Sequence, residues 1–283
     1  MTTVRKAVIA AAGLGTRMFP ITKVVEKAML PIGRRPTIDY LVRECAAAGV
    51  EEIAIVVRKG STQIQRYYGD DSDLRALLTR RGWAEKARGL DEISSVPSIT
   101  FVEQSLEDSY GTALPVLLAK DFVAGDSFFF LSSDDLLVDE PGLSTLAELA
   151  REAAGGYALV GQPVAEVALE RYGRLRTAET DGRLLLRDLV EKDSGFVDGG
   201  QALINISRYA FPAEFVSVLA SVAEHEESGE YRLTDGLLSV LRSQPVAVSV
   251  SSGSYYDLGS ERGLAEAAQR IVGDEQFGAA HPV

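Results

Sequence analysis

A glycine-rich turn followed by cationic side chains is the first stretch of this sequence with residue types suited to chemistry. Gly13 and Gly15 come soon after an apolar run, and Arg17 and Lys27 follow on the same loop. Glycine has no Cβ, so the chain can turn sharply here and bring backbone N–H groups close to a ligand. Backbone donors beside guanidinium and ammonium groups suit the phosphates of a nucleoside triphosphate.

The spacing of this turn excludes two common nucleotide-binding motifs. Position 18 is Met, where the dinucleotide fingerprint G-x-G-x-x-G requires its third glycine. No Gly-Lys-Ser/Thr follows the turn, so the stretch is not a P-loop. From the glycines alone, an ordinary turn between a strand and a helix stays an open alternative.

Two adjacent carboxylates form the second group of chemically capable residues. Asp134 and Asp135 follow the apolar run Ser127–Leu131. Open α/β sheets bind ligands at the carboxyl ends of their strands, which makes these residues candidates for a metal site, although turns and helix caps also use Asp. With one Cys and two His in the chain, a hard cation such as Mg²⁺ is favoured over a metal held by Cys or His.

The elements that would position these groups begin with a strand, a helix and a second strand. Ala7–Ala11 and Ile53–Val57 are short apolar runs, typical of parallel strands buried on both faces. Between them, Pro36–Ala48 has apolar residues at helical spacing and stops at Gly49. Further strands are predicted at Ile99–Glu103, Ser127–Leu131, Ala158–Pro163, Leu184–Val190, Gly200–Phe211 and Val246–Val250, and further helices at Ser61–Tyr68, Asp70–Leu90, Pro141–Ala154, Ala213–Glu224 and Gly263–Val272. The pattern predicts an α/β fold.

Length and charge restrict the class of protein. The 283 residues are 46% hydrophobic and 25% charged, which is ordinary for a globular protein. A net charge of −12 argues against a nucleic-acid partner and means that a polyanionic substrate needs local cations. No apolar run is long enough to span a bilayer, and the N-terminus lacks the core of a signal peptide. We therefore expect a cytoplasmic protein with no membrane partner.

The longer string around the glycine-rich turn is far more specific. It reads G-L-G-T-R-M at 13–18, P-x-T-K at 20–23 and K-x-M-L-P at 27–31. This string resembles the signature of the sugar-1-phosphate nucleotidylyltransferases, and its Met18 and Met29 are most similar to the bacterial UTP–glucose-1-phosphate uridylyltransferases. The resemblance extends from about Lys6 to Ala268. It implies a Rossmann-like, mostly parallel mixed sheet flanked by helices, in one domain over residues 1–272 with a nucleotide half and a sugar half, followed by a tail at 273–283.

The resemblance implies Mg²⁺-dependent transfer of a uridylyl group from UTP to glucose 1-phosphate, giving UDP-glucose and pyrophosphate. It assigns Asp134 and Asp257 to the metal, and Arg17, Lys27 and Lys192 to the phosphates as catalytic residues. The implied nucleotide-binding residues are Ala11, Ala12, Gly13, Gly15, Thr16, Gln104, Gly111 and Thr112. The implied sugar-binding residues are Gly173, Glu191 and Asn205. Members of this family are commonly dimers or tetramers, so a homo-oligomer is expected.

Several positions depart from the family pattern and keep alternatives open. Asp193 follows Lys192 where Pro is usual, Ser207 replaces a Gly, and Arg174 stands where an apolar residue is typical. These departures are either tolerated drift or a sign that the acceptor is not glucose 1-phosphate. Other open alternatives are dTTP in place of UTP, another sugar 1-phosphate, and a catalytically silent nucleotide-sugar binding protein. Asp135 leaves open whether it shares the metal with its neighbour.

Overall fold

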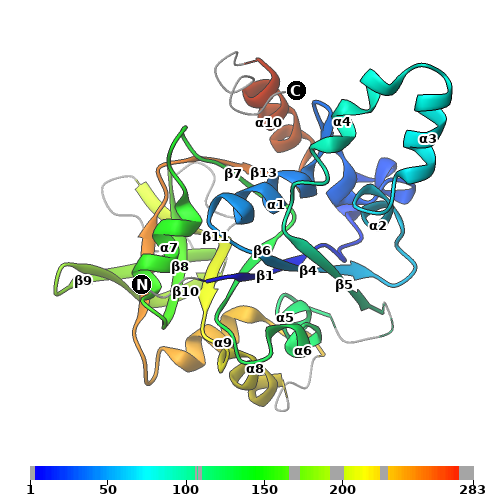
Figure 1. Ribbon diagram of the computed structural model, residues 1–283. Coiled ribbons are helices and arrows are strands. Elements are labelled where there is room, and N and C mark those ends of the chain that lie inside the picture. The colour runs from blue at the N-terminus through cyan, green and yellow to red at the C-terminus, as the bar shows by residue number, and fades with distance from the viewer. Residues whose placement is uncertain are drawn as a thin grey trace.

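A nine-stranded sheet forms the centre of the computed structural model, which describes residues 4–105, 107, 110–165, 173–191, 201–223 and 229–273 (Figure 1). The strand order is β5-β4-β1-β6-β11-β8-β12-β10-β9. These strands are β1 (Lys6–Ala10), β4 (Glu52–Arg58), β5 (Ser98–Gln104), β6 (Phe128–Ser132), β8 (Tyr157–Ala165), β9 (Gly173–Thr180), β10 (Arg183–Glu191), β11 (Gln201–Phe211) and β12 (Val246–Val250). Two small sheets pair β2 (Pro31–Ile32) with β3 (Arg35–Pro36), and β7 (Asp135–Val138) with β13 (Ser254–Asp257).

The direction of the strands divides the sheet into two parts. β5, β4, β1 and β6 pair in parallel. β11 runs antiparallel to β6 and β8, and β10 runs antiparallel to β12 and β9, so these two strands oppose the common direction of all the others. The predicted α/β fold with a mixed, mostly parallel sheet is confirmed.

Helices cover both faces of this sheet. On the upper face in Figure 1 lie α1 (Thr37–Ala47), α7 (Thr145–Ala153) and α10 (Glu261–Gly273). On the lower face lie α5 (Leu114–Leu118), α6 (Lys120–Val123), α8 (Phe215–Ala223) and α9 (Leu233–Val240). Among the described residues, no helix combines the length and apolarity needed to cross a membrane.

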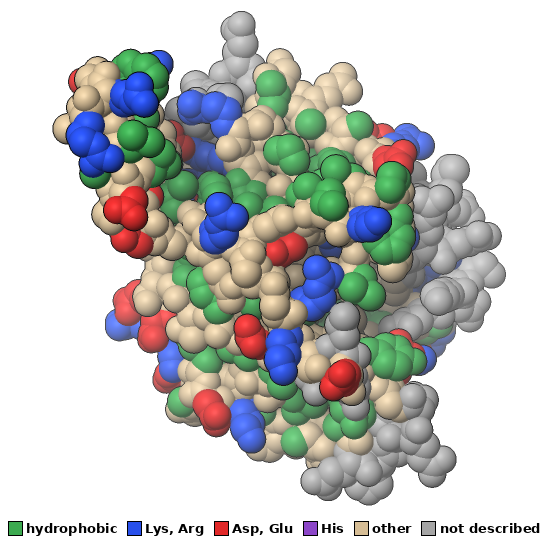
Figure 2. All heavy atoms as spheres, turned by 90° about the vertical axis from the view of Figure 1, so that its right-hand side faces the viewer, with side chains coloured by type: hydrophobic (Ala, Val, Ile, Leu, Met, Phe, Trp, Pro, Cys, Tyr) green, Lys and Arg blue, Asp and Glu red, His purple; other side chains and the backbone are tan. Residues whose placement is uncertain are grey.

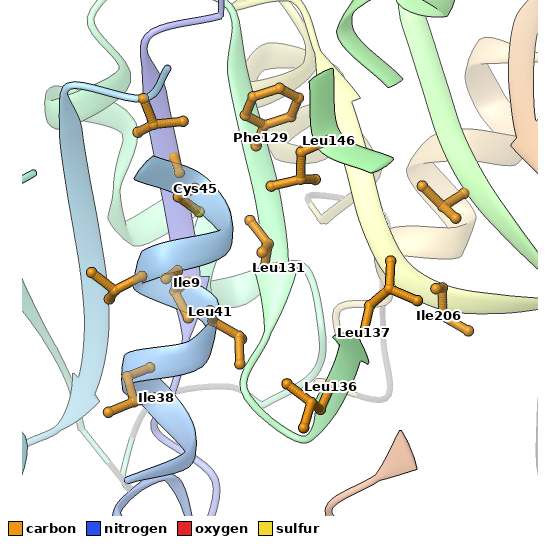
Figure 3. Packing of buried hydrophobic residues seen from close by; sticks show 14 of the residues in the cluster. Ile9, Ile38, Leu41, Cys45, Phe129, Leu131, Leu136, Leu137, Leu146 and Ile206 are labelled. Atoms are coloured by element: carbon orange, nitrogen blue, oxygen red, sulfur yellow. The ribbon is translucent and has the colours of Figure 1, made fainter. Parts of the chain in front are cut away.

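Successive residues of each central strand belong to different hydrophobic cores, because side chains alternate between the two faces of a strand. Ile9 of β1 packs in the core of the upper face, whereas Val8 packs in the core of the lower face. Figure 3 shows Leu41 and Cys45 of α1 directed toward the strands that carry Ile9 and Leu131. Cys45 is a buried core residue, as the sequence predicted, and burial raises the pKa of its thiol well above the ordinary value.

The helical insert after α2 (Gln63–Tyr67) differs from the single helix expected over Asp70–Leu90. It divides into α3 (Ser72–Arg80), the 3₁₀ turn η4 (Ala84–Ala87) and α4 (Arg88–Asp91). Gly82 lies at the break with a positive φ of 70°, a conformation that ends a helix. α3 buries none of its residues and projects from the body of the molecule (Figure 1).

The helix expected from Pro141 begins instead at Thr145, the first residue of α7. The hydroxyl of Ser144 accepts a hydrogen bond from the backbone N–H of Ala147 at 3.3 Å, which caps the helix. The carboxylate of Asp139 accepts from the backbone N–H of Thr145 at 2.8 Å. These acceptors satisfy N–H groups at the start of the helix and fix its first residue.

A buried ion pair joins α1 to the sheet. Arg208 of β11 donates from Nε and Nη2 to the two carboxylate oxygens of Glu44, at 2.8 Å each. Side-chain exposure is 0% for Arg208 and 8% for Glu44. Burial lowers the pKa of Arg208, but Glu44, Asp135 and Cys45 together raise it, so the pKa lies above its ordinary value and the guanidinium is charged. Burial also raises the pKa of Glu44, and Arg208 opposes that rise.

Removing the cation of this pair would leave the Glu44 carboxylate buried without a partner. We expect Arg208→Met to lower the free energy of unfolding by about 3–5 kcal/mol, as for other broken buried pairs. Urea-induced unfolding measures this change. The matched control is Arg262→Met, which removes the exposed partner of Glu266 on α10 and should cause no measurable loss. Equal stability of the two variants would contradict the importance given to the buried pair.

Candidate functional site

The glycine-rich loop folds back on itself and positions a lysine. Gly15 has a positive φ of 65°, and a Cβ built there would lie 3.1 Å from the Cβ of Lys27. The hydroxyl of Thr22 donates to the carbonyl of Gly15 at 2.8 Å, which closes the loop. Lys27 opens the 3₁₀ turn η3 (Lys27–Met29), and Thr37 at the start of α1 donates to the carbonyl of Ala28 in that turn at 2.9 Å. Gly15 is therefore required both for the backbone turn and for the close packing of Lys27 against the loop.

Two carboxylates meet the cations of this loop. Lys27 Nζ lies 2.9 Å from Asp134 Oδ2, and Arg17 Nη2 lies 3.8 Å from the same oxygen. Arg17 Nη1 lies 3.5 Å from Asp257 Oδ2. The two carboxylates, which are far apart in the sequence, thus face one guanidinium. Their strands bring them together, since β7 and β13 pair with Asp135 opposite Asp257.

Lys27 and a hydroxyl keep Asp134 ionised. Burial by itself would raise the pKa of Asp134, but Lys27 lowers it, and so does a hydrogen bond from the hydroxyl of Ser132. The net result is a pKa below the ordinary value for Asp. The carboxylate is therefore negative at neutral pH and available to a cation.

Asp135 differs from Asp134 although the two are adjacent. Burial and the negative charge of Asp134 raise the pKa of Asp135 to about 6. The hydroxyls of Tyr255, at 2.6 Å, and of Ser207 donate to its carboxylate and oppose this rise. Asp134 faces the glycine-rich loop, whereas Asp135 takes its partners from β13 and β11.

A cavity of about 270 Å³ opens between these groups at the edge of the sheet where β1 and β6 end. Residues from both parts of the sheet line it, and they include Arg17, Thr112, Asp134, Asp135, Gly173, Asn205, Ser207, Thr234, Tyr255 and Asp257. The place agrees with the rule that open α/β sheets bind ligands beyond the carboxyl ends of their strands. Figure 2 looks onto the side of the molecule from which α3 projects, and single Lys and Arg side chains lie there among acidic and hydrophobic ones.

Gly111 and Thr112 pack against the segment that leads into α9. A Cβ at Gly111, whose φ is 118°, would lie 2.2 Å from the carbonyl oxygen of Tyr231. The hydroxyl of Thr112 accepts from the backbone N–H of Leu233 at 3.0 Å. Only glycine fits this close approach of two backbones, and the contact sets the wall of the cavity that Thr112 and Thr234 share.

The structure brings six of the predicted site residues to the lining of this cavity: Arg17, Thr112, Asp134, Gly173, Asn205 and Asp257. Lys27 contacts the same site through Asp134. The other predicted nucleotide-binding residues lie outside the lining, at or beyond the carboxyl ends of β1 and β5 or in the turn before α5: Ala11, Ala12, Gly13, Gly15, Thr16, Gln104 and Gly111. Glu191 ends β10 opposite Gly173, and Lys192 lies outside the described residues.

Sequence reasoning missed the groups that hold the predicted residues in place. Ser132 donates to Asp134, and Tyr255 donates to Asp135. Arg208 donates from Nη2 to the backbone carbonyl of Asp135 at 2.8 Å. Ser132 could have been found, because it ends the strand directly before the carboxylates. Arg208 gave no local signal, since its partners come from distant parts of the chain.

The donor set at the site suits a hard cation. Asp134 and Asp257 offer carboxylate oxygens, and the guanidinium of Arg17 already bridges them as a positive group. Among the described residues, no group of three or more His, Cys, Asp or Glu could hold a metal ion. Two carboxylates agree with Mg²⁺, which binds through one or two carboxylates and takes its remaining ligands from substrate phosphates and water.

Comparisons of the sequence with known proteins identify its family. The family profile described as nucleotidyl transferase matches residues 6–273. The UTP–glucose-1-phosphate uridylyltransferase YngB of Bacillus subtilis (strain 168) is 32% identical over 270 residues, which are 95% of this chain and 89% of YngB.

Solved structures share the fold over nearly the whole chain. A UTP-bound UGPase from Acinetobacter baumannii is 26% identical with a TM-score of 0.84, over 99% of this chain and 97% of that one. A UDP-glucose pyrophosphorylase complexed with UDP-glucose is 25% identical with a TM-score of 0.77, over 95% of this chain and 99% of that one. The resemblance found in the sequence motifs is thus confirmed, and the chain belongs to the nucleotidyl transferase family.

Proposed function

We propose that this chain transfers a uridylyl group from UTP to glucose 1-phosphate, forming UDP-glucose and releasing pyrophosphate. The observation that carries this proposal is the convergence of Asp134 and Asp257 on Arg17, beside Lys27, at the carboxyl ends of the central strands. Relatives named as uridylyltransferases and a neighbour solved with bound UTP support the choice of substrates.

The reaction is an in-line attack of the sugar phosphate oxygen on the α-phosphorus of UTP. A phosphate oxygen is already a competent nucleophile, so the chain needs no general base. Its residues must instead position two polyanions and neutralise the charge that develops between them. We assign Arg17 to the β- and γ-phosphates and Lys27 to the α-phosphate. Lys192, which the structure does not describe, is assigned to the phosphate of the sugar.

Asp134 and Asp257 are the residues that would hold Mg²⁺. The bound cation would neutralise charge on the α-phosphate and on the departing pyrophosphate. In the protein without substrates, Lys27 and Arg17 neutralise the same two carboxylates. The phosphates of UTP can take over both cations, which frees the carboxylate oxygens as ligands.

The remaining assignments follow the two parts of the sheet. We place the base, ribose and phosphates of the nucleotide along Ala11, Ala12, Gly13, Gly15, Thr16, Gln104, Gly111 and Thr112. We place the sugar against Gly173, Glu191 and Asn205, on the strands beyond β6. We also propose that residues 1–272 act as one domain in a homo-oligomer, and the cytoplasmic location stays a prediction.

Pyrophosphate release from a small grid of substrates tests the proposed function. We expect the strongest release with UTP and glucose 1-phosphate and the loss of that signal when EDTA removes divalent cations. The grid sets UTP and dTTP against glucose, galactose and N-acetylglucosamine 1-phosphates. A signal confined to dTTP or to another sugar would contradict the choice of substrates, and binding of nucleotide without any turnover would favour a silent nucleotide-sugar binding protein.

Asp134 and Asp257 should each contribute to catalysis without being needed for folding. We expect Asp134→Asn and Asp257→Asn each to lower kcat by ~10²–10³-fold, the usual cost of removing a well-placed charge at a reacting phosphate. Steady-state kinetics gives this change, and circular dichroism checks that each variant is folded. Asp126→Asn, which alters an exposed carboxylate paired with Lys6, is the matched control. Normal kcat in Asp134→Asn would overturn the assignment of the metal site.

Gly259 offers a way to displace Arg17 without changing its charge. A Cβ at Gly259 would lie 2.2 Å from Arg17 Nη2 and 2.9 Å from Asp257 Oδ1, so the long Arg17 side chain must move. We expect Gly259→Ala to raise KM for UTP by about tenfold, equal to ~1.4 kcal/mol of binding, while KM for the sugar changes little. Gly89→Ala is the control, because a Cβ there meets nothing within 4 Å. An unchanged KM for UTP would show that Arg17 does not bind the nucleotide.

A further inference from the structure

A bulge in β11 places a serine against the cavity in a conformation that favours glycine. The pairing of β11 with β8 shifts register between Asn205 and Tyr209. Inside this bulge Ser207 has a φ of 50°, in the left-handed region. A residue with a side chain is strained there, and such strain is found where the surrounding structure and function require it. A role for the hydroxyl of Ser207 in the cavity would account for a serine at this position in place of glycine.

Hydrogen bonds connect Ser207 to a row of polar groups along this side of the cavity. Its backbone N–H donates to Asn205 Oδ1 at 3.3 Å, and Asn205 Nδ2 lies 2.6 Å from the hydroxyl of Tyr209. The hydroxyl of Ser207 donates to the carboxylate of Asp135. The hydroxyl of Tyr255 donates to Asp135 Oδ1 at 2.6 Å. The row thus runs from β11 through β7 to β13, and all five side chains belong to the cavity lining.

The carboxylate of Asp135 has different partners from that of its neighbour Asp134. Asp134 pairs with Lys27 and Arg17 of the glycine-rich loop. The carboxylate of Asp135 accepts hydrogen bonds from the neutral hydroxyls of Ser207 and Tyr255, and the charge of Arg208 also acts on it. A carboxylate accepts about four hydrogen bonds, so these two donors leave acceptor capacity for a ligand.

The position of this carboxylate points toward the acceptor substrate. Gly173 and Asn205 line the same cavity, and both belong to strands beyond β6, away from the loop that follows β1. We propose that Asp135, positioned by Ser207 and Tyr255, accepts a hydrogen bond from a hydroxyl of the acceptor sugar and selects neutral sugar 1-phosphates over those of sugar acids. This inference rests on the proposed function and adds a specificity-determining residue to it. An acidic sugar would bring a second carboxylate into the cavity that Asp135 lines, and like charges at short range repel.

The variant Asp135→Asn tests the inference, since it keeps the size of the side chain and removes its charge. The panel consists of glucose 1-phosphate and glucuronic acid 1-phosphate with UTP. We expect KM for glucose 1-phosphate to rise about tenfold, the effect of one hydrogen bond to a charged group. We expect kcat/KM for the acid, relative to glucose 1-phosphate, to rise by about tenfold or more because the repulsion is gone. KM for UTP should stay unchanged, and Asp126→Asn should alter none of these values.

Ser207 is a positioning residue, and its variants separate the hydroxyl from the backbone. Ser207→Gly removes the hydroxyl and relieves the strain at φ 50°, so we expect an equal or higher Tm together with a raised KM for glucose 1-phosphate. Ser207→Ala removes the hydroxyl and keeps the strain, so KM should rise equally while Tm falls. Adding Ser207→Gly to Asp135→Asn should raise KM little further, because residues that act through one another are not additive.

The outcomes distinguish this inference from the proposed function. One outcome is that the wild-type protein turns over UTP and glucose 1-phosphate while Asp135→Asn has the same KM for the sugar and the same preference against the acid as the wild type. That result would overturn the inference and leave the proposed function intact. A KM for UTP that rises as much as that for the sugar would also overturn it, since Asp135 would then serve the nucleotide. A folded wild-type protein with no turnover on either sugar would overturn the proposed function and the inference with it.

Discussion

The guanidinium of Arg208 lies fully buried beneath the site and donates to groups from three elements. It binds Glu44 of α1, the backbone carbonyl of Asp135 in β7, and the carbonyl of Ile206 in β11 at 3.5 Å. The turn that carries Asp134 and Asp135 is therefore fastened to α1 and β11 through one cation. Because the pair is buried, a shift of any one of these elements leaves a buried charge or carbonyl unsatisfied.

Charge is the second constraint on the site. The chain carries a net charge of −12, yet both proposed substrates are polyanions. Arg17 and Lys27 meet this requirement locally, and Asp134 and Asp257 hold them in place while no phosphate is bound. The side chain of Arg17 is 61% exposed, whereas that of Lys27 is only 13% exposed, so water screens the pair of Lys27 with Asp134 less. In the proposed reaction, the phosphates would take over these two cations, and Mg²⁺ would compensate the carboxylates that they leave.

The sequence predicted the local features of this site better than its connections. The strand before Gly13, the cations after it and the carboxylates after β6 were all recognisable, because strand, turn and charge follow one another within a few residues. The pair of Glu44 and Arg208 was not predictable, since it joins residues 164 positions apart. The helical insert was placed correctly, but its break at Gly82 needed the backbone conformation. The strand β9 was missed because most of its residues are polar, so it has no apolar run like those of the central strands.

Asp134 and Asp135 stand where the two parts of the sheet meet. β6 pairs in parallel with β1 on one side and antiparallel with β11 on the other, and the carboxylates follow its carboxyl end. Asp134 lies in the turn before β7, and Asp135 is the first residue of β7. The carboxylate of Asp134 contacts Lys27 of the loop after β1, while that of Asp135 accepts from Ser207 in the bulge of β11. One dipeptide can thus contact both substrates, provided that the turn beneath it is rigid, and the buried Arg208 supplies that rigidity.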